Sequence, residues 1–166
     1  MLFGGLFAGI TVGAFITGAG FLSGLLPPGT PHRLPNPCRT INVARLVPGN
    51  VQPISGGGRV IGQCSARTPS TSATGYSAVE IEVTEQPTEM QSRGCTALAA
   101  LGTVRHVGGL GDAACAVTED GRLRITTVLV RRAGLRVYLR YSSEAKDAAA
   151  VERDALDTAR RVTSAL

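Results

Sequence analysis

Four cysteines and two histidines are the residues of this 166-residue chain whose types most often do chemistry. Cys38, Cys64, Cys95 and Cys115 are widely spaced, without the C-x2-C pairs typical of zinc sites. An enzyme could pair one cysteine with His32 or His106, but this interpretation leaves an odd thiol unexplained. An even number of cysteines that follow an apolar, membrane-targeting segment at the N-terminus favours two disulfides in an oxidising compartment. Of the three possible pairings we prefer the sequential one, Cys38–Cys64 and Cys95–Cys115.

A glycine-rich stretch, Gly109-x-Gly111-x-x-Ala114, superficially matches a dinucleotide-binding motif. That motif must open a helix and have an acid about twenty residues later. Here a hairpin strand is expected to follow, and position 131 is arginine. We therefore predict a tight turn built on Gly109, Gly111 and Asp112, with Asp112 accepting hydrogen bonds from nearby backbone amides. No motif for catalysis, a metal or a cofactor is recognised, so none of these is predicted.

The formal net charge is +5, and all 17 basic and 12 acidic residues come after residue 26. An excess of basic over acidic residues favours anionic partners. Arg124, Arg136 and Arg140 form a candidate face for an anionic lipid surface or wall polymer. The alternative is that these arginines only keep the surface soluble. Nucleic acid is not expected as a partner, because three tyrosines are the only aromatic residues among the arginines.

The first 26 residues contain no charged side chain and hold all four phenylalanines. As a helix they would be about 39 Å long, enough to cross a hydrocarbon core of roughly 30 Å. We predict an uncleaved transmembrane anchor over 1–26, a proline-rich spacer over 27–37 and an extracytoplasmic domain over 38–166. Because disulfides form outside the cytoplasm, they orient the chain as a single-pass protein of the cell membrane, with residues 27–166 outside. A signal peptide that is cleaved to release a secreted domain is the alternative.

The outer domain has the alternating pattern of an α+β fold with a mostly antiparallel sheet. Val79, Ile81 and Val83 alternate with glutamates, as in a half-buried strand whose acidic face could pair with the arginines. Phe and Trp are absent after residue 26, so we expect a core of Val, Leu, Ile, Ala and Tyr. The expected elements are helices over 38–47, 87–101 and 144–166, and strands over 59–66, 79–83, 115–118, 122–131 and 135–141.

Three short stretches occur in order before a closing amphipathic helix: Asn36-Pro37-Cys38 before a helix, Cys64-Ser65 in a strand, and Val107 to Ala114, which reads V-G-G-L-G-D-A-A. This order resembles a family of actinobacterial cell-envelope lipoproteins of unknown function. Here Asn36 replaces the family's acid, no Trp follows Cys64, and a spacer helix replaces the lipid-modified cysteine. The resemblance covers about 36–166 and implies a PsbP-like α/β/α sandwich. It implies no catalytic residues.

Composition excludes collagen-like, coiled-coil and fully disordered classes, and the length indicates one domain outside the membrane. We therefore expect a membrane-anchored, non-catalytic domain that binds an envelope protein, a lipid or an anionic wall polymer. A secreted enzyme that uses Cys115 or His106 is the alternative.

Overall fold

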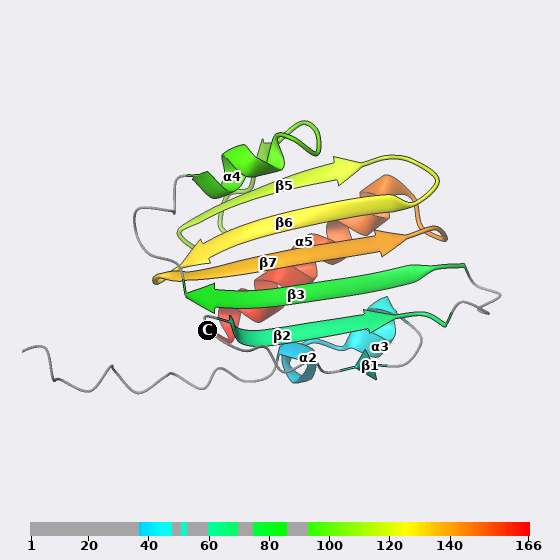
Figure 1. Cartoon of the computed structure of the whole chain (residues 1–166), viewed down its shortest axis with the longest axis horizontal. Coiled ribbons are helices and arrows are strands. Elements are labelled where there is room, and N and C mark those ends of the chain that lie inside the picture. The colour runs from blue at the N-terminus through cyan, green and yellow to red at the C-terminus, as the bar shows by residue number, and fades with distance from the viewer. Residues whose placement is uncertain (1–36, 48–50, 53–59, 70–74, 86–92) are drawn as a thin grey trace, which may run out of the picture. The chain divides into compact units, whose positions relative to one another are not determined.

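The computed structural model describes residues 37–47, 51–52, 60–69, 75–85 and 93–166 (Figure 1). All of them belong to one compact unit, Leu34–Leu166. The predicted anchor over 1–26 and most of the predicted spacer over 27–37 lie outside the described residues. Within the described residues, no helix is long and apolar enough to cross a membrane. Pro37, the last residue of the predicted spacer, is buried at the start of a helix, where the fixed φ of proline suits the first turn.

In the described residues, seven antiparallel strands form one sheet in the order β1-β2-β3-β7-β6-β5-β4. The α+β class and the antiparallel sheet are therefore confirmed. The long pairing of β3 with β7 joins residues that are 50 to 66 positions apart in sequence. The strands are β1 (Val51–Gln52), β2 (Val60–Arg67), β3 (Ser77–Glu85), β4 (Arg105–His106), β5 (Ala113–Glu119), β6 (Arg124–Arg132) and β7 (Leu135–Ser143).

The C-terminal helix α5 (Ala148–Ser164) lies across one face of the sheet, against β6 and β7 (Figure 1). Asp147 caps it by accepting a hydrogen bond from the Ala150 N–H at 2.7 Å, so the helix begins later than residue 144. Its apolar stripe is fully buried, and the alanines let the helix approach the sheet closely. The buried stripe consists of Val151, Ala155, Ala159 and Val162.

Two short helices, α2 (Pro37–Thr40) and α3 (Val43–Leu46), replace the single helix expected over 38–47. Asn42 separates them because its side chain caps α3, accepting from the Arg45 N–H. Their apolar residues join the same core as α5, so these three helices share one face of the sheet. The core is built mainly from valine and alanine, and its largest buried side chain is Tyr141.

The helix α4 (Arg93–Leu98) lies on the opposite face, over β5 and β6. Leu98 of this helix forms a second small apolar cluster with Cys115 and Val117 of β5. Cys115 alternates with Ala114 and Ala116 of the main core, so its side chain points away from α5. Of the helix expected over 87–101, residues 87–92 lie outside the described residues.

Both predicted disulfides are confirmed. Cys38 of α2 is bonded to Cys64 of β2, with Cα atoms 5.2 Å apart, and Cys95 of α4 is bonded to Cys115 of β5, with Cα atoms 5.9 Å apart. Each bond therefore ties a helix of only four or six residues to a strand.

The glycine-rich turn before β5 contacts the hairpin between β6 and β7. The Asp112 N–H donates to the Arg131 carbonyl at 2.7 Å, and the Asp112 carboxylate accepts from the Ala133 N–H at 2.8 Å. Ala133 and Gly134 both have positive φ, as a two-residue type I′ turn requires. Gly111 also has positive φ, and a Cβ there would collide with the Arg131 carbonyl oxygen. Asp112 thus fixes a turn that is distant in sequence.

Gly111→Ala should destabilise the domain far more than Gly109→Ala. Both glycines have φ between +60° and +70°, so each alanine costs about 1 kcal/mol for the left-handed backbone. Only Gly111 is in contact with backbone, and the collision adds about 2 kcal/mol. Urea denaturation of the full chain in neutral detergent measures both losses. Equal losses would contradict the packing described for Gly111.

Candidate binding surface

The face of the sheet opposite α5 carries the charged side chains of its central strands. We call its part over β2, β3 and β7 the open face. Among the described residues, no helix packs on this part, since α4 contacts β5 and β6. By strand alternation its members are Gln63, Ser65, Arg67, Ala78, Glu80, Glu82, Thr84, Arg136, Tyr138, Arg140 and Ser142.

The charges of the open face are arranged across the β3–β7 pairing. Glu80 lies directly opposite Arg140, and Glu82 lies opposite Tyr138. The Arg136 guanidinium forms an ion pair with the Glu82 carboxylate at 3.6 Å. This is the cross-strand pairing of acids and arginines expected from the sequence. Because both partners are partly exposed, the ion pair contributes at most about 1 kcal/mol.

The predicted face of Arg124, Arg136 and Arg140 does not form, because Arg124 lies on the other side of the sheet. Arg124 pairs in register with Ser143, whose side chain is buried on the α5 side. Its guanidinium donates to the Glu144 carbonyl at 3.0 Å. Arg67 of β2 takes the third place on the open face instead.

A hollow of about 270 Å³ lies at one end of the open face. It exists because Ala78 and Ser142, which are neighbours across β3 and β7, have small side chains. In the part of the chain that the structure describes, no hydrogen bond or ion pair engages the side chains of Arg67, Arg140 or Glu80. The lining residues are Ser65, Ala66, Arg67, Tyr76, Ala78, Val79, Glu80, Leu123, Ile125, Arg140 and Ser142.

Most of this hollow was missed from the sequence. Arg67 lies one residue beyond the predicted end of its strand, and Tyr76 and Leu123 lie in connecting segments. These residues meet through the pairings of β2 with β3 and of β6 with β7. The alternating strand 79–83 was the one local signal, and it correctly placed acids and arginines on a common face.

The residues considered for catalysis lie outside the open face. The Cys115 sulfur is bonded to Cys95 and fully buried, so it is not available as a thiolate. His106 lies exposed on the edge strand β4, opposite Cys115. Within the described residues, no group of three or more His, Cys, Asp or Glu side chains could hold a metal ion. Gly109, Gly111 and Asp112 belong to the turn before β5, away from the hollow's lining.

No protein-family model matches the chain, and no curated protein or solved structure matches it. The resemblance to actinobacterial envelope lipoproteins therefore stays a prediction from short motifs.

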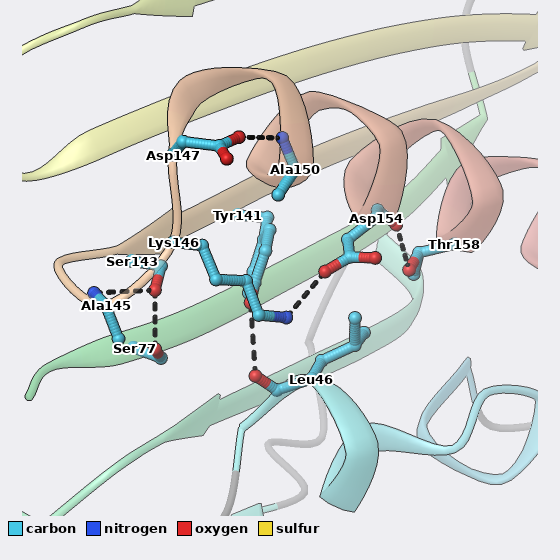
Figure 2. A network of polar contacts seen from close by, with 10 residues as sticks. All are labelled: Leu46, Ser77, Tyr141, Ser143, Ala145, Lys146, Asp147, Ala150, Asp154 and Thr158. Carbon is cyan, nitrogen blue, oxygen red and sulfur yellow. Dashed lines mark hydrogen bonds and ion pairs between the residues drawn. The ribbon is translucent and has the colours of Figure 1, made fainter. Parts of the chain in front are cut away.

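A second polar cluster holds the N-terminal end of α5 against α3 and β7 (Figure 2). The buried Tyr141 hydroxyl donates to the Leu46 carbonyl at 3.2 Å. Lys146, the one lysine of the chain, donates to the Asp154 carboxylate at 2.5 Å, and its ammonium lies 5.3 Å from the centre of the Tyr141 ring. The hydrogen bonds and the cation–π contact of this cluster all join residues of the chain to one another. We therefore interpret the cluster as structural.

The pKa of Lys146 lies above its usual value. Partial burial acts to lower it, but the hydrogen bonds to Asp154 and Tyr141 and the charges of these groups outweigh that effect. A raised pKa in the folded state means that folding favours the protonated ammonium. Its contribution is present in full below the unfolded pKa of about 10.4 and is lost as the pH rises through the folded value.

Lys146→Met should therefore lower the melting temperature at pH 7 by about 2–4 °C, equivalent to roughly 1 kcal/mol. The difference from the wild type should shrink as the pH rises above about 10.4, because the wild type loses the same interaction there. Circular dichroism melts across this pH range measure both effects. Arg160→Met is the matched control, since Arg160 pairs with Asp157 on the exposed side of the same helix. A pH-independent difference for Lys146→Met would contradict the ionic role.

Proposed function

We propose that the chain is a membrane-anchored extracytoplasmic domain that binds a component of the cell envelope without catalysis. The open face is its binding surface. The observation that carries this proposal is the hollow on that face, with two arginines and a glutamate that no side chain engages in the described structure. A concave site with a few convergent polar groups is the usual form of a ligand-binding site.

The extracytoplasmic location is supported by the disulfides. All four cysteines are paired, and disulfides persist in oxidising compartments. The uncharged segment 1–26 would supply the anchor, and 27–36 the remaining spacer. Cleavage of that segment would instead release the same domain as a secreted protein.

The finer fold proposal is a PsbP-like α/β/α sandwich. Helices on both faces of the antiparallel sheet and a closing helix α5 support it. The two helical layers are unequal, because α4 is short and lies near one edge of the sheet. This inequality is what leaves the open face accessible among the described residues.

The proposed partners are an envelope protein, a lipid or an anionic wall polymer. On the open face, Arg67, Arg136 and Arg140 outnumber Glu80 and Glu82, so its charge favours an anionic partner. Nucleic acid is not proposed, because the face carries Tyr138 with few other rings on which bases could stack. No observation in the described structure favours the enzyme alternative based on Cys115 or His106.

Cosedimentation of the purified full chain with washed envelope fragments tests this proposal. The wild-type chain should bind, and Arg136→Gln/Arg140→Gln should weaken binding about tenfold, equivalent to roughly 1.4 kcal/mol. Arg153→Gln/Arg161→Gln removes the same charge from exposed positions on α5 and should change binding less than twofold. Absence of binding, or equal loss in both variants, would contradict a specific role of the open face.

A further inference from the structure

The lining of the hollow combines charged groups, hydroxyl groups and an apolar wall. Arg67 and Arg140 provide guanidinium donors. Glu80 provides an acceptor and Ser65 provides a hydroxyl group. The Ser142 hydroxyl donates to the Ala78 carbonyl at 3.4 Å, so it can serve a ligand only as an acceptor. Tyr76, which is 38% exposed, forms an apolar wall together with Leu123 and Ile125. A ligand for this site therefore has an anionic group, several hydroxyls and an apolar side.

The size and charge of the hollow narrow the class of ligand. Its volume of about 270 Å³ is below the roughly 300–1,000 Å³ of sites for drug-sized molecules, so one small ring fits and a lipid with its acyl chains does not. Two arginines and one glutamate leave one net positive charge. This balance suits a single carboxylate, which guanidinium groups bind through paired hydrogen bonds.

We propose that the hollow binds one uronic acid unit of an acidic envelope polysaccharide. Arg67 and Arg140 bind the sugar carboxylate, while Glu80 and Ser65 hydrogen-bond its hydroxyls. The C–H face of the pyranose ring packs on Tyr76. A polymer suits this position, because neighbouring sugar units can continue along the open face. This inference rests on the proposed function and names the ligand of the same surface.

Calorimetric titration of the full chain with a tetramer of galacturonic acid tests the inference, in a polyoxyethylene detergent that carries no sugar. We expect saturable binding, and at least tenfold weaker binding of the methyl-esterified tetramer, which keeps the sugar and loses the charge. Arg67→Gln and Tyr76→Ala should each weaken binding at least fivefold. Arg131→Gln, a change on the same side of the sheet outside the hollow, should alter it less than twofold. Thermal melts check that each variant is folded.

Three results would overturn the inference. They are equal binding of the esterified tetramer, equal binding of poly(glycerol phosphate), which has charge but no sugar ring, and a loss in Arg131→Gln as large as that in Arg67→Gln. Failure of the uronate to bind while envelope fragments still retain the wild-type chain would overturn this ligand and leave the proposed function standing. Failure of both assays would overturn the proposed function as well.

Discussion

Two disulfides determine which parts of the sheet are covered. The helices α2 and α4 have four and six residues, too few to be stable alone. Cys38–Cys64 attaches α2 on the α5 side, and Cys95–Cys115 attaches α4 on the opposite side. They close separations of 26 and 20 residues, which corresponds to about 3 kcal/mol each in the chain-entropy model. Since the core relies on valine and alanine, these cross-links are a large share of a typical net stability of about 5–15 kcal/mol.

The open face is a consequence of this arrangement. The helices α2, α3 and α5 fill one side of the sheet, while α4 is fixed near its β5 edge. The central strands β3 and β7 are left with charged side chains on their other side, and the small Ala78 and Ser142 create the hollow. A rigid sheet holds Arg67, Arg140 and Glu80 at fixed register positions, which is what the proposed recognition of a small acidic ring requires.

Features encoded locally could be predicted from the sequence. These were the disulfide pairs, the alternation of 79–83, the strand over 135–141 and the C-terminal helix. The hollow could not be predicted, because Arg67 and Arg140 are brought to the same hollow only by the β2–β3–β7 register, which no short pattern encodes. The misplacement of Arg124 was avoidable. A two-residue turn pairs Arg132 with Leu135, and this register puts Arg124 and Arg136 on opposite faces.

The most direct measurement of the central claim combines a thiol titration with calorimetric melting of the full chain taken from its native compartment. The account predicts four blocked thiols and a fall in melting temperature of well over 10 °C on reduction. The pairs Cys38→Ala/Cys64→Ala and Cys95→Ala/Cys115→Ala should each reproduce part of that fall, because each removes about 3 kcal/mol. Four free thiols, with oxidised and reduced chains melting together, would contradict both the cross-linked architecture and the extracytoplasmic location.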